Sequence, residues 1–365
     1  MARPLAEEQY GQFSARVCSR TIADAQPTRV QFELTYRCNI HCVHCYTDPF
    51  NTLDAVGREL DLHEISRIFD ELADAGVLWM TMTGGEALVH PQFRRIYQEA
   101  KRRGFIISLY SNGTTVSESL ADFLAADPPF TIDVSCHAAT SGTFDRITQV
   151  SGSFNLFQQG VGRLMARALP LTIKTKAMTT NRHELSRIKT LVEDLGLDFH
   201  VFTTIHPRLN GDLTSTHYRL TPREIIDLEV GETADGCEGV CGSRDRAGAN
   251  TLTEPPSDDR LFRCGCGTNT CTINPYGVLR ACTHTTWPSI DLNTTPFAQA
   301  FARLVNQVRN ARYTGASPCA ACTAHVFCHK NPAMAVHEAG AMEAPVTHYC
   351  EVAFGKAARL GQTCK

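Results

Sequence analysis

Short apolar runs alternate with amphipathic segments between about residue 30 and residue 205. Runs of this kind, rich in β-branched and aromatic residues, predict buried strands. Six of them occur, at 30–36, 77–83, 105–111, 130–136, 171–178 and 199–205. The segments between the runs have helical periodicity, and the first of these places Ile65, Ile68 and Leu72 on one face. The first half of the chain therefore reads as a series of strand–helix units.

Strand–helix alternation predicts an α/β fold with a parallel sheet and right-handed crossovers. Six such units either close partly into a barrel or form an open, doubly wound sheet. In both architectures the functional site lies at the carboxyl ends of the strands. Cys38, Gly84, Asn112 and Ser135 each come at or just after the end of a predicted strand. We expect these residues to converge.

The pattern changes after residue 207. A linker-like stretch is followed by a region rich in Gly, Asp and Ser, and then by a cysteine-rich part with few long periodic segments. This texture predicts a small domain held by metal rather than by an apolar core. We therefore divide the chain into an N-terminal extension, a strand–helix domain, a bridging region and a cysteine-rich domain, at 1–29, 30–215, 216–260 and 261–365.

Composition narrows the class of protein. The 365 residues are 43% hydrophobic and 20% charged, as in an ordinary soluble globular protein. The net charge of −3 is not the excess of positive charge that is typical of proteins that bind nucleic acid or an anionic membrane. No apolar run is long enough to span a membrane, and the N-terminus lacks the plan of a signal peptide. We expect a cytoplasmic protein.

The sixteen cysteines are numerous for such a chain and are unevenly placed. Disulfides are rare in the reducing cytosol, where clustered cysteines more often bind metal or take part in chemistry. Apart from Cys18 and Cys136, the cysteines fall in three groups, at 38–45, 237–282 and 319–364. Metal binding is therefore the first property to consider.

The first group is the segment RCNIHCVHCY, in which Cys38, Cys42 and Cys45 follow the first predicted strand. Thiolates are soft ligands that select zinc, copper(I) or iron–sulfur clusters. A zinc site would use a fourth ligand, such as His41, His44 or a distant residue. A [4Fe–4S] cluster held by three cysteines keeps one iron open for a substrate or cofactor. The spacing alone leaves both alternatives open.

The cysteine loop and a second motif together resemble the radical S-adenosylmethionine (SAM) enzymes. The loop has that family's C-x3-C-x2-C spacing after the first strand, and Gly84-Gly85-Glu86 follows the second strand. The resemblance implies a partial (βα)6, TIM-like barrel in which the three cysteines hold a [4Fe–4S] cluster and SAM binds its open iron. It also implies a set of residues around SAM: His44, Gly84, Gly85, Glu86, Asn112, Ser135 and Lys174.

The C-terminal cysteines resemble the SPASM domain, an extension that holds auxiliary iron–sulfur clusters in many radical SAM enzymes. The resemblance implies one auxiliary [4Fe–4S] cluster bound by Cys319, Cys322, Cys328 and Cys350. A further cysteine of the family pattern is replaced by Pro332, so a first auxiliary site lacks its usual fourth ligand. Three solutions stay open: an open iron, recruitment of Cys237, Cys241 or Cys364, or a local set of Cys264, Cys266, Cys271 and Cys282. A zinc ribbon is the other interpretation of these cysteines.

The resemblance also implies a reaction. One electron from the cluster cleaves SAM to a 5′-deoxyadenosyl radical, which abstracts hydrogen from a peptide, and one or two auxiliary clusters assist. We expect an oxidoreductase that matures a ribosomally synthesised peptide by a cross-link or another modification. No catalytic residue is assigned beyond the cluster and SAM.

The expected partners are the peptide and an electron donor such as ferredoxin or flavodoxin. Residues 1–29 are few for a leader-recognition domain, so a separate protein is expected to supply that function. Two alternatives are kept: a radical SAM enzyme acting on a small molecule or tetrapyrrole, and a zinc-binding scaffold.

Overall fold

A nine-stranded sheet organises the chain. The computed structural model describes residues 9–47, 51–231, 259–263, 265–315 and 317–363. The strands follow the order β6-β5-β4-β3-β2-β1-β7-β8-β9, and the first six pair in parallel. These six are β1 (Arg29–Glu33), β2 (Trp79–Thr83), β3 (Ile106–Ser111), β4 (Thr131–Ser135), β5 (Leu171–Lys176) and β6 (Asp198–Phe202). All six predicted strands are confirmed, with ends that differ by at most three residues.

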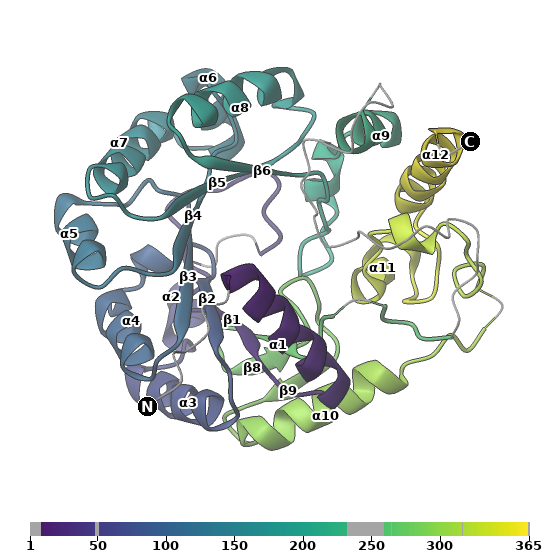
Figure 1. Cartoon of the computed structure of the whole chain (residues 1–365), viewed down its shortest axis with the longest axis horizontal. Coiled ribbons are helices and arrows are strands. Elements are labelled where there is room, and N and C mark those ends of the chain that lie inside the picture. The colour runs from purple at the N-terminus through teal and green to yellow at the C-terminus, as the bar shows by residue number, and fades with distance from the viewer. Residues whose placement is uncertain (1–8, 48–50, 232–258, 264, 316, 364–365) are drawn as a thin grey trace, which may run out of the picture.

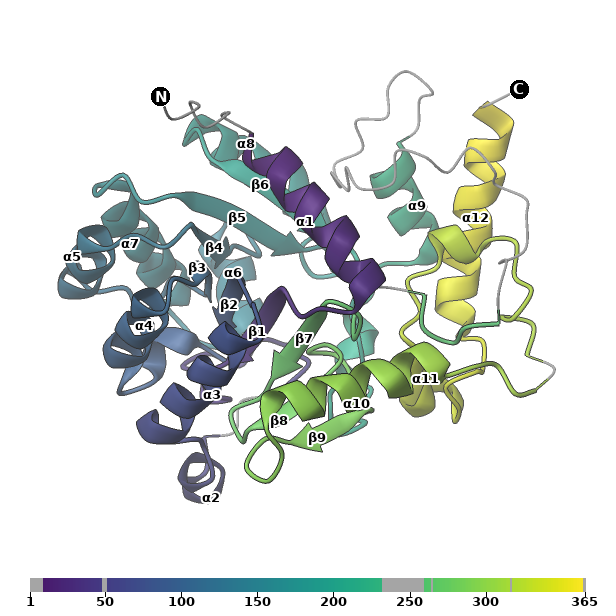
Figure 2. The ribbon, with the colours of Figure 1, turned by 60° about the horizontal axis from the view of Figure 1, so that its bottom comes forward.

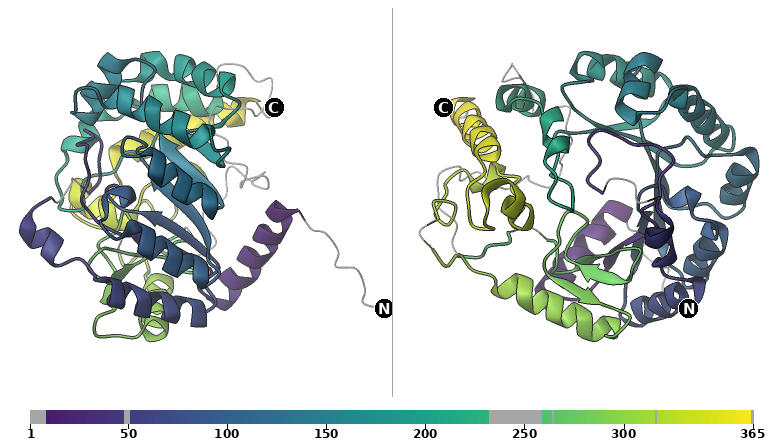
Figure 3. Two further views of the ribbon diagram at one scale, coloured as in Figure 1. Left: turned by 90° about the vertical axis from the view of Figure 1, so that its left-hand side faces the viewer. Right: turned by 180° about the vertical axis from the view of Figure 1, so that it is seen from behind.

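Crossover helices cover the convex face of the sheet and form an arc around it (Figure 1; Figure 3, right). They are α3 (Leu62–Asp74), α4 (Phe93–Arg102), α5 (Glu118–Ala126), α6 (Ser141–Thr148), α7 (Ser153–Met165) and α8 (Leu185–Asp194). Helix α3 begins at a capping box formed by Asp61 and Glu64 and buries its apolar face. This arrangement is a partial barrel, one of the two architectures that the alternation left open and the one that the family resemblance implied.

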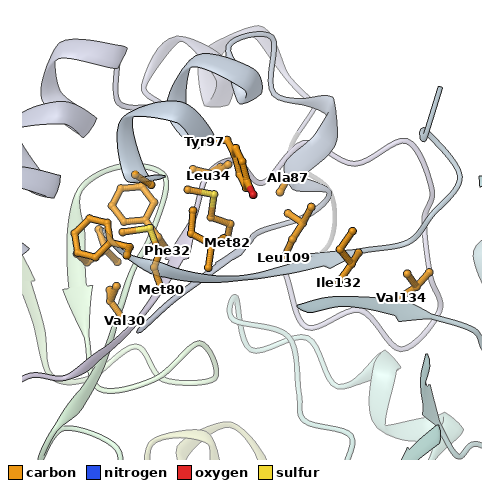
Figure 4. Packing of buried hydrophobic residues seen from close by; sticks show 14 of the residues in the cluster. Val30, Phe32, Leu34, Met80, Met82, Ala87, Tyr97, Leu109, Ile132 and Val134 are labelled. Carbon is orange, nitrogen blue, oxygen red and sulfur yellow. The ribbon is translucent and has the colours of Figure 1, made fainter. Parts of the chain in front are cut away.

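The apolar core lies between the sheet and these helices. Figure 4 shows Phe32, Met82 and Leu109 on the helix side of their strands, with Tyr97 of α4 pointing toward them. The other face of the strands is polar and carries Lys174. Successive strand residues alternate between faces, so every crossover helix packs on one face while the concave face stays free for polar groups.

The C-terminal part continues the same sheet. Strand β7 (Thr270–Ile273) pairs in parallel with β1, and β8 (Val278–Arg280) and β9 (Ser289–Asp291) follow antiparallel. Helix α10 (Phe297–Asn310) packs beside α3 and lies below these strands in Figure 1, and its buried residues join the main core. The boundary at residue 261 stays a prediction, and the sheet runs across it.

The expectation of few long periodic segments after residue 207 is wrong. Helices α10 and α12 (Thr347–Thr363) have 14 and 17 residues, and α10 buries Phe297, Phe301 and Leu304. These are ordinary amphipathic helices, so an apolar core contributes to this part as well. Shorter helices complete it: α9 (Pro222–Val230), η3 (Thr214–Tyr218), η5 (His325–Phe327) and α11 (Pro332–Ala339).

Helix α1 (Tyr10–Asp24) closes the opposite end of the sheet from the predicted site. Its Tyr10 hydroxyl accepts a hydrogen bond from Trp79 Nε1 at 2.7 Å, and Ser14 accepts one from Arg29 at 2.6 Å. Arg29 and Trp79 are the first residues of β1 and β2, so α1 lies at the amino ends of the strands (Figures 2 and 3). No helix in the described part of the chain is long and apolar enough to cross a membrane.

Three short helices fall in the connections of the first half: α2 (Leu53–Gly57), η1 (Ala87–Val89) and η2 (Arg182–Glu184). Helix η1 begins directly after Glu86, whose side chain caps it by accepting a hydrogen bond from the Leu88 N–H. The polypeptide therefore turns sharply at the carboxyl end of β2.

Two glycines let the backbone after β2 touch the backbone after β1. The Gly85 N–H donates to Thr35 O at 2.8 Å, and the Glu86 N–H donates to Arg37 O at 2.9 Å. A Cβ atom on Gly84 would lie 2.2 Å from Thr35 O, and one on Gly85 would lie 2.4 Å from Arg37 O. The pairing of β1 and β2 thus continues beyond the strands because these residues have no side chain.

We expect Gly85→Ala to lower the free energy of unfolding by roughly 2–4 kcal/mol, because its methyl group overlaps the Arg37 carbonyl. Gly162→Ala is the matched control. Gly162 is exposed within α7 and has open space where a Cβ would stand, so the exchange should raise stability by about 0.5–1 kcal/mol. Urea denaturation measures both values. Equal stability of the two variants would contradict this account of the close approach.

Candidate metal and cofactor site

The three N-terminal cysteines lie together in the loop after β1. The end of α6 anchors this loop, since the His41 N–H donates to Thr148 O at 2.8 Å and the Val43 N–H to Ile147 O at 3.0 Å. Burial, and next the Glu86 carboxylate, raise the pKa of Cys38 to about 12. Burial and the other two thiols raise the pKa of Cys42 well above its usual value. A nearby cation favours the thiolate form of such groups, and thiolates are soft ligands, so these residue types suit a soft metal centre.

Asn112 connects this loop to the end of β3. Its Nδ2 lies 3.8 Å from the Cys38 Sγ and also donates to Asn39 Oδ1 at 3.0 Å. Its backbone N–H donates to the Glu86 carboxylate at 2.6 Å. Asn112 was predicted at the site because it follows a strand, and the structure brings it into contact with the first cysteine.

The Glu86 carboxylate is buried and satisfied by the protein itself. Besides the Asn112 N–H, it accepts hydrogen bonds from Ser111 Oγ at 3.0 Å and from the Leu88 N–H at 3.1 Å. Burial raises the pKa of Glu86 to about 7. The side chain therefore joins the ends of β2 and β3, while the amides of Gly85 and Glu86 face the backbone after β1. A direct contact of these residues with SAM stays a prediction.

His44 contacts a residue that follows β4. Its ring meets that of His137 edge-to-face, with centroids 4.6 Å apart. Its Nδ1 is buried and has no hydrogen-bond partner among the described residues. Burial lowers the pKa of His44 well below its usual value, so the ring is neutral. The predicted position of His44 near SAM stays a prediction.

The two lysines of β5 both lie on the polar face. Lys174 Nζ is 2.8 Å from Asp133 Oδ1 and 2.9 Å from the Tyr110 hydroxyl. Lys176 Nζ donates to Thr204 O at 2.8 Å, nearer the carboxyl end of the strand. Ser135 pairs with Lys174 in the sheet and ends β4. The Lys174 amine, which was predicted to bind SAM, therefore already contacts two protein side chains. Its binding to SAM stays a prediction.

Four of the C-terminal cysteines, Cys319, Cys322, Cys328 and Cys350, lie within the described residues. Burial, and next the thiols of the other three, raise the pKa of Cys350. No group of three or more His, Cys, Asp or Glu side chains among the described residues is placed to hold a metal ion. Lys330 Nζ lies 3.6 Å from the Cys319 Sγ, which places a positive charge beside this thiol. These four cysteines are the set that the resemblance assigned to one auxiliary cluster.

The other C-terminal cysteines separate. Cys266 contacts Cys282, and the hydrogen bond between their side chains lowers the pKa of Cys282 well below its usual value. Cys271 instead sits within β7, 2% exposed, with its Sγ 4.0 Å from Arg29 O in the main core. Burial alone raises the pKa of Cys271. The structure does not bring Cys271 to Cys282, and Cys264 lies outside the described residues, as do Cys237, Cys241 and Cys364.

The sequence interpretation missed a buried ion pair beside the cysteine loop. Glu33, which ends β1, is 2.6 Å from Arg280, which ends β8, and both side chains are at most 5% exposed. The Tyr46 hydroxyl donates to Glu33 at 2.8 Å. The only hint in the sequence is an acidic residue inside the apolar run VQFEL. Its partner comes from a distant part of the chain.

A row of aromatic and imidazole rings runs from this pair toward the C-terminal cysteines. Tyr46 and His284 have ring centroids 4.6 Å apart, and His284 and His206 are 4.5 Å apart. The hydroxyl of Tyr349, the residue before Cys350, lies 3.3 Å from His206 Nδ1. These side chains therefore form a chain of contacts from Tyr46, which follows Cys45, to Tyr349.

Residues 32–184 match the family model of the Radical SAM superfamily. The chain is 29% identical to the AdoMet-dependent heme synthase of Methanosarcina barkeri, over 51% of this chain and 53% of that protein. It is 31% identical to the PqqA peptide cyclase of Ruegeria pomeroyi, over 47% of this chain and 45% of that protein. The chain thus spans about half the length of both relatives.

Among solved structures, the chain is similar to Streptococcus suis SuiB bound to precursor peptide SuiA. The TM-score is 0.67 at 12% identity, covering 96% of this chain and 84% of SuiB, so the likeness concerns the fold. The family match covers the end of β1, the cysteine loop, the glycine turn and the four strands β2 to β5. The similarity to the Radical SAM superfamily therefore concerns residues 32–184.

Proposed function

We propose that this protein is a radical SAM enzyme that modifies a ribosomally synthesised peptide. Three cysteines in the loop after β1, within the segment that matches the Radical SAM superfamily, carry the proposal. Cys38, Cys42 and Cys45 would hold the cluster. When bound, a [4Fe–4S] cluster with one open iron supplies the electron that cleaves SAM, and the resulting 5′-deoxyadenosyl radical abstracts hydrogen from the substrate.

The chain's own residues would position SAM and exclude water. Glu86 fixes the turn after β2, so the carbonyl groups of Gly84 and Gly85 are held at the edge of the site. The neutral ring of His44 offers an apolar surface. Ser135 and Lys174 are proposed to bind polar groups of SAM, and Lys176 is the alternative amine because it lies nearer the strand end.

The C-terminal cysteines are proposed to hold auxiliary iron–sulfur clusters. Cys319, Cys322, Cys328 and Cys350 form a complete set of four thiolate ligands. Cys266 and Cys282 would hold a second centre, near which Asn331 Nδ2 lies 3.7 Å from the Cys282 Sγ. The buried position of Cys271 supports leaving it out of this second set.

Two observations support a peptide as the substrate. The fold matches that of a protein bound to a precursor peptide over nearly the whole chain, and a relative is named as a peptide cyclase. The similarity to a heme synthase favours a tetrapyrrole as the second candidate. We propose a cytoplasmic site of action, a ferredoxin or flavodoxin as electron donor and a separate leader-recognition protein.

Protein purified without oxygen should be brown with the broad visible absorption of iron–sulfur clusters. Reduction in the presence of SAM should release 5′-deoxyadenosine, and Cys42→Ala should abolish this release because the cluster loses one of three ligands. Chromatography of the products measures it. Cys136→Ala is the control, since Cys136 is buried in the main core and should keep the activity. A colourless protein that contains only zinc would disprove the proposal.

Iron analysis separates the ligand sets. Cys319→Ala should lower the iron content by about four per chain, whereas Cys271→Ala should leave it unchanged. A total of about eight irons indicates two clusters and about twelve indicates three. If the Cys271→Ala variant loses iron while circular dichroism shows that it is still folded, Cys271 is a cluster ligand and this assignment is wrong.

The substrate class is tested with short peptides encoded beside the gene and, in parallel, with an iron tetrapyrrole. A peptide substrate should change in mass only when SAM and reductant are present, because hydrogen abstraction needs both. Mass spectrometry measures the change. Conversion of the tetrapyrrole alone would replace the peptide proposal by the second candidate.

A further inference from the structure

The Glu33 carboxylate is the centre of a buried polar network at the end of β1. It is fully buried and accepts three hydrogen bonds. The donors are the Tyr36 hydroxyl at 2.9 Å, the Tyr46 hydroxyl at 2.8 Å and Arg280 Nη2 at 2.6 Å. A buried carboxylate is costly unless it is paired and hydrogen-bonded, and here both oxygens are used.

Two of these donors stand at the two ends of the three-cysteine loop. Tyr36 precedes Cys38 by two residues, and Tyr46 directly follows Cys45. The Glu33 carboxylate is therefore hydrogen-bonded to a residue at the beginning of the loop and to a residue at its end. The distance between the loop's ends depends on Glu33 as well as on the backbone bonds to α6.

The third donor ties the same carboxylate to the C-terminal cysteines. Arg280 ends β8, two residues before Cys282, and its Nη1 donates to Thr285 O at 3.2 Å. The Thr285 N–H and hydroxyl in turn donate to Cys282 O at 3.2 and 3.0 Å. The guanidinium thus holds the turn that carries Cys282 while it pairs with the carboxylate that holds the first loop.

A second contact joins the same two segments. The ring of Tyr46 packs on that of His284, and the Thr283 hydroxyl lies 3.0 Å from His284 Nδ1. Arg280 Nη2 also donates to the Tyr36 hydroxyl at 2.8 Å. Both loop ends therefore contact the C-terminal turn as well as Glu33, so the loop and the turn share one set of contacts.

We propose that Glu33 and Arg280 are positioning residues that couple the two cysteine segments. The three-cysteine loop takes the shape that holds its cluster only when the β7–β8 hairpin is docked and Arg280 is paired. The inference rests on the proposed cluster of Cys38, Cys42 and Cys45. It adds that the geometry of this cluster depends on a residue of the C-terminal part.

The experiment compares Glu33→Gln, Arg280→Met, the double variant and Tyr46→Phe in the full chain, reconstituted without oxygen. The readout is the change that SAM causes in the electron paramagnetic resonance spectrum of the reduced protein. Only a cluster with an open iron responds to SAM directly, so this signal reports the three-cysteine loop. Thermal stability is measured on the same samples.

Each single charge variant should lower the SAM-responsive signal at least about fivefold, because one buried charge is left unpaired. The double variant should recover at least about half of it, since neither charge remains. Tyr46→Phe removes one hydrogen bond without altering charge, and it should change the shape of the spectrum in a folded protein. If a charge variant does not fold, the spectrum of Tyr46→Phe tests the coupling in its place.

Lys356→Met is the matched control. Lys356 is a buried cation that pairs with Glu229 between α12 and α9, so its loss leaves the partly buried Glu229 carboxylate without its cation. It should lower thermal stability and keep the wild-type spectrum. A wild-type spectrum in Tyr46→Phe and in each folded charge variant, or an equal loss of signal in Lys356→Met, would overturn the coupling. Absence of the signal in the wild-type chain would instead refute the proposed function.

Discussion

The pairing of β1 on both of its edges is the constraint on which the structure depends. Strand β2 pairs with one edge and β7 with the other, so β1 joins the strand–helix series to the C-terminal hairpin. The same strand leads into the three-cysteine loop. The position of that loop is therefore set by hydrogen bonds to two parts of the chain that are far apart in sequence, and the close approach of Gly84 and Gly85 extends this control beyond the strand.

Most of the first half of the fold could be predicted from the sequence. The six parallel strands are short apolar runs between helices with clear periodicity, and each of these signals is local. The convergence of Cys38 and Asn112 followed from the rule that parallel strands end at one edge. Helix α10 was missed although Phe297, Phe301 and Leu304 have ordinary helical spacing. The many cysteines had favoured a metal-held domain over an apolar core.

The finer features of the site depend on contacts between distant residues. Glu33 and Arg280 are 247 positions apart, and nothing local in either segment indicates that they meet. Their contact follows from the register of β7 on β1 and of β8 on β7, which a single sequence does not reveal. For Cys271 a local signal did exist. It shares strand parity with Ile273, whose side chain faces the core, so Cys271 faces the core as well.

The long sequence separation within the ion pair has a consequence for biosynthesis. A ribosome makes the three-cysteine loop well before it makes Arg280, because chains grow from the N-terminus. During that interval Glu33 has no cationic partner from the hairpin, and the outer edge of β1 has no strand beside it. Under the proposed coupling, the loop reaches its final shape only after the β7–β8 hairpin has been made. A cluster in this loop would accordingly be loaded only after residue 280 has been added to the chain.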